Sequence, residues 1–276
     1  MTLVSITGIL YLVSSLFFIF FWKTNSDRIL RMGLSLLATG SIIHLIFFVQ
    51  KYWINQQFPI FHLSAVFSAM SLLLSLSFLL LIFWFPLHSF GVLAAPASFV
   101  LLLLALFFYN HDQTVSIFGD MASPLFPLHV SSMVIAESSA VISLVFGVTY
   151  LLLERQLKSK KLGFLFQRFP SLDIIDDLYW NFLLISLVSM TGGLILGSFW
   201  AKHLWGEYWS WDPRQIWSLT FWIFTVTLVF CRKKFAFRGR KLIMITIIGF
   251  SVLFCSHLSI HLLGIGRHLG NYGLER

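Results

Sequence analysis

Eight runs of apolar residues, each close to 20 residues long, constrain this sequence more than any other feature. The runs cover residues 3–22, 30–49, 62–84, 90–109, 129–153, 178–200, 214–231 and 241–262. About 20 consecutive apolar residues span the hydrocarbon core of a bilayer as one helix. The sequence does not show the alternating ten-residue pattern of transmembrane barrel strands. We therefore expect an all-α fold, a polytopic transmembrane helical bundle of about eight spans.

The positive charges are distributed unevenly, and this predicts the orientation. Of 19 lysines and arginines, 14 lie in the segments 23–31, 154–177 and 232–241. By the positive-inside rule these segments are cytoplasmic, so both termini and the connection after residue 200 face outward. Topology thus accounts for the net charge of +8, and no basic surface with base-reading groups indicates nucleic acid. We expect a multi-pass protein of the plasma (inner) membrane, with its first 22 residues retained as a helix.

The stretch WGEYWSWDP, which begins at Trp205, lies in one of the outward connections. Six of the ten tryptophans fall between residues 200 and 222, whereas interfacial tryptophans usually scatter along a membrane protein. This density favours a rigid apolar platform for a planar aromatic ligand, with Gly206 allowing close approach. Asp212 followed by Pro213 predicts a helix N-cap and first helical residue. Alternatively, these rings only anchor two helices at the interface.

Two histidines lie at the outer interface on either side of this stretch in the sequence. His129 follows two prolines and begins the fifth apolar run, and His268 follows the last run. Neutral imidazole is a common haem iron ligand, and two imidazoles fill both axial positions. Lys202, Arg214 or Arg267 could pair with the propionates. The residues therefore suggest an outward-facing haem site, although each histidine taken singly also fits a structural role.

Other polar groups inside the apolar runs have simpler explanations. Three single histidines are expected to be hydrogen-bonded or interfacial rings: His44, His62 and His88. Glu137 lies two helical turns beyond the start of the fifth run, and an intramembrane carboxylate indicates either a functional group or a protonated or paired one. Gly193 and Gly197 form a GxxxG motif, which predicts close helix packing.

No metal-binding or redox motif is evident. His257 and His261 are one helical turn apart, but no third ligand or nearby carboxylate completes a zinc site. Cys231 and Cys255 are the only cysteines. Without CxxC or CxxCH, the chain has no thioredoxin-like site and no covalent haem-attachment site of its own.

The segment WGEYWSWDPRQIWSLTFW resembles the tryptophan-rich WWD signature of haem-handling proteins in cytochrome c biogenesis. In the sequence this segment lies between LHVSSM, around His129, and LLGIGRH, ending at His268. The three segments in this order resemble the CcsA (ResC) family. The resemblance is strongest across 165–231 and loose across the first 110 residues. We expect a single integral membrane domain, 1–276, in which 111–276 form a haem-handling core with a WWD loop at 200–214.

The resemblance implies a role in haem delivery and attachment, as a subunit of a system II-type cytochrome c synthase or haem lyase complex. His129 and His268 would be the axial ligands of the iron of haem b, and no side chain would be catalytic. The residues implied to hold the macrocycle are Trp205, Gly206, Trp209, Trp211 and Asp212. The implied partners are a CcsB/ResB-like membrane protein, an apocytochrome c bearing CxxCH, haem and membrane lipids.

Two departures from the family pattern concern the route of haem through the bilayer. Phe230 stands where the family usually has a transmembrane histidine, and His261 replaces an asparagine, with His257 a turn earlier. We therefore hypothesise that the chain has no inner bis-histidine haem site. Two alternatives remain open: a CcmC-like exporter or chaperone without ligation activity, and a HemX-like non-catalytic membrane subunit.

Overall fold

The structure is a computed structural model, and the residues it describes are 2–55, 58–60, 62–109, 123–159, 168–235 and 237–262. Every regular element in these residues is a helix. Eight of the helices are long and apolar enough to cross a membrane. The predicted all-α fold with about eight spans is therefore confirmed.

The chain divides into two compact units. One contains Met1–Asp112 and Leu153–Leu172, and the other contains Gln113–Leu152 and Asp173–Arg276. The long helix α5 (Leu125–Lys158) belongs to the second unit over most of its length and to the first at its end. That the whole chain acts as a single membrane domain stays a prediction.

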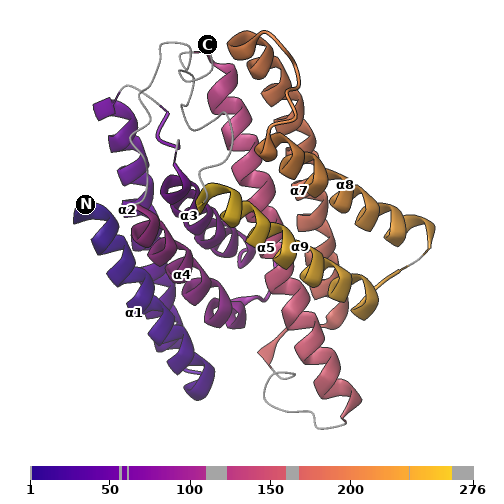
Figure 1. Cartoon of the computed structure of the whole chain (residues 1–276). Helices are drawn as coiled ribbons and strands as arrows, with labels where there is room; N and C mark the ends of the chain where they lie inside the picture. Colours follow the sequence, from indigo (N-terminus) through magenta and orange to yellow (C-terminus); the bar gives the residue numbers. More distant parts are fainter. Residues whose placement is uncertain are drawn as a thin grey trace. The chain divides into compact units, whose positions relative to one another are not determined.

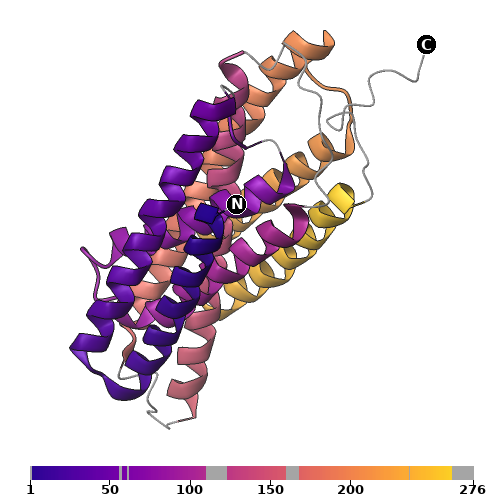
Figure 2. The ribbon, with the colours of Figure 1, turned by 90° about the vertical axis from the view of Figure 1, so that its left-hand side faces the viewer.

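The first unit is built from four membrane-spanning helices. These are α1 (Thr2–Thr24), α2 (Asp27–Asn55), α3 (Leu63–Leu81) and α4 (Gly91–Tyr109), with the short 3-10 helix η1 (His88–Phe90) leading into α4. Helix α1 packs along α2 and against α4, and α3 packs along α4 (Figures 1 and 2).

The core of the first unit holds a polar network among its apolar side chains. The hydroxyl of Tyr11 lies 2.9 Å from Ser75 Oγ, 3.3 Å from Ser41 Oγ and 3.4 Å from His44 Nδ1. His44 Nε2 lies 2.8 Å from Ser68 Oγ. Inside a bilayer each polar atom needs such a partner, since no water is at hand. His44 is thus the hydrogen-bonded ring that the sequence predicts.

The second unit contains α5, α7 (Leu172–Trp205), α8 (Pro213–Lys234) and α9 (Arg240–Leu262). Helices α5 and α7 each have 34 residues, or about 51 Å at 1.5 Å per residue. This exceeds the roughly 30 Å hydrocarbon core, so their ends extend to the level of the headgroups. Helices α8 and α9 lie side by side (Figure 1).

Interhelical hydrogen bonds fix the helices of the second unit. Tyr179 of α7 pairs with Thr246 of α9 across 2.6 Å, and Ser143 of α5 donates to the carbonyl oxygen of Tyr179 at 3.1 Å. The indole of Trp222 donates to Thr191 Oγ1 at 2.9 Å. Such bonds join transmembrane helices whose apolar side chains gain little by leaving lipid.

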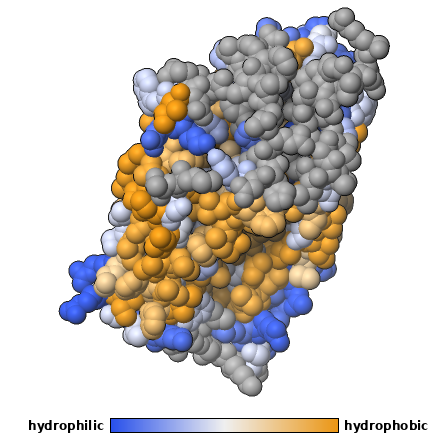
Figure 3. Space-filling model, turned by 60° about the vertical axis from the view of Figure 1, so that its left-hand side comes forward, coloured by the Kyte–Doolittle hydropathy of each residue, from blue (hydrophilic) through white to orange (hydrophobic). Residues whose placement is uncertain are grey.

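Many large apolar side chains are exposed on the helices, as expected for surfaces that face lipid. Examples from both units are Ile9, Phe20, Val188 and Val252. Figure 3 shows a broad band of hydrophobic side chains over the described part of one face, with hydrophilic side chains at its lower edge and again toward its upper end. A continuous apolar surface of this extent fits a protein embedded in a bilayer.

Candidate functional site

Helix α7 ends in a glycine turn at the start of the tryptophan-rich connection. Gly206 follows Trp205 with φ +78°, and its N–H donates to the carbonyl oxygen of Lys202 at 3.0 Å. The ammonium group of Lys202 donates to the Gly206 carbonyl oxygen at 2.6 Å. An added Cβ at Gly206 would meet nothing within 4 Å. Glycine is therefore required by the left-handed backbone, not by space.

Helix α8 begins with the cap that the sequence predicts. Asp212 is the N-cap and accepts a hydrogen bond from the Arg214 N–H at 2.9 Å, with Pro213 as the first helical residue. Gln215 Oε1 accepts from the N–H of Ser210 at 2.9 Å, which pins the preceding backbone in the manner of a capping box. Gln215 was not predicted as part of this cap, although the Asp-Pro-Arg-Gln spacing, with Gln three residues after the N-cap, is a sequence signal for it.

The non-helical connection covers only residues 206–212 and is shorter than the predicted loop 200–214, because both helices extend into it. Trp211 adopts φ +57° and is 69% exposed, an unfavourable conformation for a bulky residue. Its ring meets that of Trp209 edge to face, at 5.7 Å and 87°. The loop therefore presents separate ring faces and edges instead of one flat layer.

His129 is the predicted ligand with the most defined surroundings. It lies in the first turns of α5, and its Nδ1 is 2.8 Å from the carbonyl oxygen of Gly193 in α7. A carbonyl oxygen only accepts, so this geometry makes Nδ1 the protonated nitrogen and places the lone pair on Nε2. The imidazole stacks on the indole of Trp200 at 6.2 Å and 16°.

The imidazole of His129 packs against the GxxxG motif of α7, where the glycines leave room for it. A Cβ added to Gly197 would lie 2.6 Å from His129 Cε1 and 2.7 Å from Nδ1, and one added to Gly193 would lie 2.6 Å from Met133 Sδ. The neighbouring Gly192 has nothing within 4 Å of an added Cβ. The motif thus permits the predicted close packing, and it does so by receiving side chains of α5.

Trp200 connects this imidazole to the tryptophan-rich connection. It is buried, and its ring contacts Phe126 at 5.2 Å and Trp205 at 5.8 Å. In the sequence Trp200 is one of the clustered tryptophans, but nothing in the sequence assigns it to the site. The structure therefore brings His129 and Trp205 into contact with the same buried indole.

Of the other polar groups singled out in the sequence, the structure describes some and leaves others out. His268, the second predicted ligand, and the side chain of His261 lie outside the described residues. His257 packs on Trp217 with ring centroids 4.0 Å apart, and Trp217 donates to the Leu253 carbonyl oxygen at 2.8 Å. Glu137 is buried on α5.

The imidazole of His129 is a donor of the kind that binds haem iron. In the part of the chain that the structure describes, no group of three or more His, Cys, Asp or Glu side chains could hold a metal. An imidazole whose Nδ1–H is held by a backbone carbonyl has the orientation that metal-ligating histidines usually have.

Comparison with known proteins also indicates a relation to haem-handling proteins. Residues 62–268 match the family described as "Cytochrome C assembly protein". A "Cytochrome c biogenesis protein CcsA" of Synechococcus sp. (strain CC9902) is 26% identical over 282 residues, covering 92% of this chain and 90% of the relative. The CcsA protein of Chlamydomonas reinhardtii is 28% identical over 193 residues, covering 66% of this chain and 51% of that protein.

One solved structure shows a similar fold. The protein titled "Cytochrome c Heme Lyase CcmF" aligns with a TM-score of 0.56 at 16% sequence identity. The alignment covers 97% of this chain and 49% of the other, so the chain spans about half the length of that protein. At this identity the likeness concerns the arrangement of helices alone.

Proposed function

Because the chain belongs to the cytochrome c assembly protein family, we propose that it binds haem at the WWD loop and presents it to an apocytochrome c. Its role lies in the maturation of c-type cytochromes. In the proposed mechanism His129 and His268 bind the haem iron, and the loop residues Trp205, Trp209 and Trp211 contact the macrocycle.

The geometry of His129 carries the proposal. The Gly193 carbonyl holds the Nδ1 proton and fixes the plane of the ring, so Nε2 has the lone pair that an iron ligand needs. The same ring lies parallel to Trp200, which contacts Trp205 at the end of α7. A structural imidazole would be hydrogen-bonded as well, as His44 is. His129 differs because its ring contacts Trp200, which in turn contacts Trp205 at the start of the WWD loop.

The chain's residues position the reactants and supply no nucleophile. The substrate haem brings vinyl groups, and the apocytochrome brings the cysteine thiols of its CxxCH motif. The axial ligands and the ring faces of the loop would hold haem in one orientation, which lowers the entropic cost of the reaction. The cap at Asp212 and the glycine turn at Gly206 keep the loop in place between α7 and α8.

The partner, the haem type and the orientation are part of the same proposal. We propose haem b as the substrate, a CcsB/ResB-like membrane protein as partner, and the plasma membrane as location, with the loop on the outer side. The concentration of positive charge in 23–31, 154–177 and 232–241 supports that orientation.

The inner half of the membrane is proposed to lack a second haem site. Phe230, at the position of the family's transmembrane histidine, is 53% exposed and contacts Phe235 at 5.7 Å. A phenyl ring cannot bind iron. His257 lies in the last turns of α9 against Trp217, near the beginning of α8, whereas Phe230 lies near its end.

Co-expression with an apocytochrome c reporter tests the function. We expect covalent haem attachment with the wild-type chain and its partner, and loss of attachment with His129→Ala. Added imidazole should partly restore it by supplying the missing ligand. Haem bound to this chain without any attachment would instead support the CcmC-like carrier. Absence of haem would support a non-catalytic subunit.

A further inference from the structure

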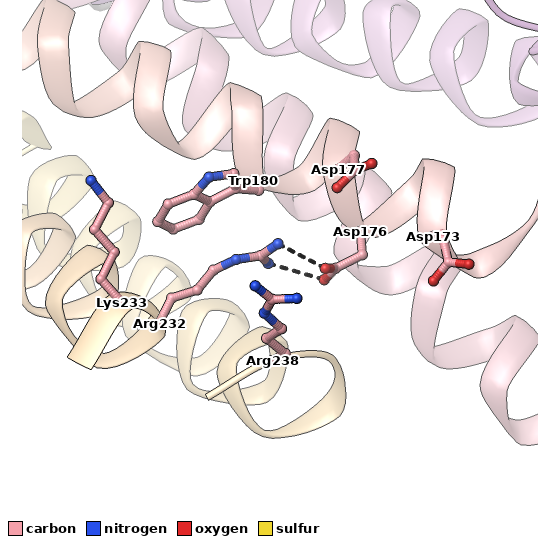
Figure 4. Close-up of a pocket in the computed structure, with 7 residues that line it drawn as sticks. All are labelled: Asp173, Asp176, Asp177, Trp180, Arg232, Lys233 and Arg238. Carbon is pink, nitrogen blue, oxygen red and sulfur yellow. Dashed lines mark hydrogen bonds and ion pairs between the residues drawn. The ribbon is translucent and has the colours of Figure 1, made fainter. Parts of the chain in front are cut away.

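A pocket lies at the opposite end of α7 and α8 from the WWD loop. It has a volume of about 620 Å³. The side chains that line it are Asp173, Asp176, Asp177, Trp180, Arg232, Lys233 and Arg238 (Figure 4). None of these residues takes part in the proposed haem site, so the pocket requires its own explanation.

The pocket is divided into an acidic and a basic side. Its three carboxylates come from the first turns of α7, and its three cations come from the end of α8 and the turn that follows (Figure 4). Acidic residues at a helix start and basic residues at a helix end are individually stabilising. Helix stabilisation does not, however, explain why both sets line one open cavity.

A partly buried ion pair lies in the pocket. Arg232 donates two hydrogen bonds to Asp176, from Nη1 at 3.1 Å and from Nη2 at 2.8 Å, and the Arg232 side chain is only 8% exposed. Its guanidinium group lies 4.5 Å from the centre of the Trp180 ring. A two-bonded, stacked arginine is rigid. Figure 4 shows Arg238 next to this ion pair, whereas Lys233 extends past Trp180 on the other side of Arg232, and Asp173 lies beyond Asp176 on the side away from Lys233.

Apolar rings next to the pocket connect it with the lipid. Phe230, Phe235 and Phe237 follow one another through ring contacts of 5.7 and 6.0 Å, and all three are exposed. Phe230 belongs to the membrane span of α8, whereas Phe237 is next to Arg238. The strip therefore runs from the hydrocarbon level to the level at which charged groups leave the bilayer.

We propose that this pocket binds the headgroup of a phospholipid that carries both a phosphodiester and a primary amine. Arg238 would receive the phosphate, with Lys233 adding positive charge at the other end of the pocket. Asp173 and Asp177 would accept hydrogen bonds from the ammonium group, and the acyl chains would lie along the phenylalanine strip. Equal numbers of acidic and basic side chains suit a zwitterion. A dianion such as the two propionates of haem would meet the acidic side unfavourably. This inference does not depend on the haem site.

Lipid titration of the purified full-length protein in detergent tests the proposal, with bound lipid counted by native mass spectrometry. We expect phosphatidylethanolamine to bind more tightly than phosphatidylglycerol, which lacks the amine. It should also bind more tightly than phosphatidylcholine, whose methylated nitrogen cannot donate hydrogen bonds. Arg238→Gln and Asp177→Asn should each weaken phosphatidylethanolamine binding about tenfold, by removing a charge-assisted hydrogen bond.

Lys234→Gln is the matched control, because Lys234 is an exposed cation beside Lys233 that does not line the pocket. It should leave binding unchanged. Equal binding of the three lipids, or equal loss with Lys234→Gln and Arg238→Gln, would overturn the proposal in favour of unspecific surface charge. Equally tight binding of soluble glycerophosphoethanolamine would show that the site takes a free phosphate amine instead of a lipid.

Discussion

At the scale of single residues, Gly197 sets the position of His129. A methyl group there would lie 2.6 Å from the imidazole, so Gly197→Ala should displace the ring from the Gly193 carbonyl at a cost of about 1–3 kcal/mol. We expect a lower haem content and an altered visible spectrum. Gly192→Ala, five residues earlier in the same helix and with nothing within 4 Å of the added carbon, should keep the wild-type spectrum.

This pair of variants separates positioning from ligation. If His129→Ala changes the spectrum and Gly197→Ala does not, packing against Gly197 is not needed for haem binding, but His129 is still supported as the iron ligand. If neither variant changes the spectrum, the ligand assignment itself is wrong.

Trp211 gives a test of the alternative that the loop rings only anchor helices. Its φ of +57° costs about 1–2 kcal/mol in a non-glycine residue. Trp211→Gly should therefore raise the free energy of unfolding slightly, by about 1 kcal/mol after the added chain entropy of glycine. Haem retention should fall, because an exposed ring is lost.

Unfolding in graded denaturant and haem content of the same preparation give both quantities. A Trp211→Gly protein that is less stable yet retains its haem would support the anchoring role.

Site features that depend on neighbouring residues in the sequence could be predicted. Contacts between helices that are distant in the sequence could not. The Asp212 cap follows from two adjacent residues and is confirmed. The partner of His129 is 64 residues away in α7. Helix spacing could show that Gly193 and Gly197 share a face, but not that an imidazole of α5 occupies it. Trp200 was missed for the same reason.

At the scale of elements, the start of α8 depends on Asp212. Asp212→Ala removes the acceptor of the Arg214 N–H and should lower the free energy of unfolding by about 0.5–2 kcal/mol. Asp212→Asn keeps a capping oxygen and should restore most of this loss. Denaturant unfolding measures both variants. If alanine and asparagine destabilise equally, the carboxylate acts through its charge and not through the cap.

The helix boundaries show what apolar runs predict. The run 178–200 marks the part of α7 that crosses the bilayer, whereas the helix extends over Leu172–Trp205. Polar residues beyond the hydrocarbon core continue the helix, with Asp173 in its first turn and Lys202 in its last. Hydropathy reports the membrane-embedded part alone, so it underestimates helices that project beyond it.

At the scale of the whole molecule, the orientation rests on the 14 positive charges assigned to the inner side. Reporter fusions test it directly. A phosphatase that is active only outside the cytoplasm should be silent when fused after residue 160 and active when fused after residue 268. The reverse pattern would place the WWD loop inside and contradict an outward-facing haem site.

The described site residues belong to one compact unit of the chain, Gln113–Leu152 with Asp173–Arg276. That residues 111–276 form a haem-handling core stays a prediction. The fold class and the number of spans could be predicted because hydrophobic length is explicit in sequence. For His129 and the WWD loop, the sequence predicted only that both lie at the outer membrane interface, and not which residues connect them.

The visible absorption spectrum of the purified protein tests the central claim most directly. The wild-type chain should carry haem, and the spectrum of the reduced haem should be that of iron with two axial histidine ligands. His129→Ala and His268→Ala should each lower the haem content or shift that spectrum, with partial recovery on adding imidazole. A wild-type protein that binds no haem, or two single variants with unchanged haem spectra, would contradict it.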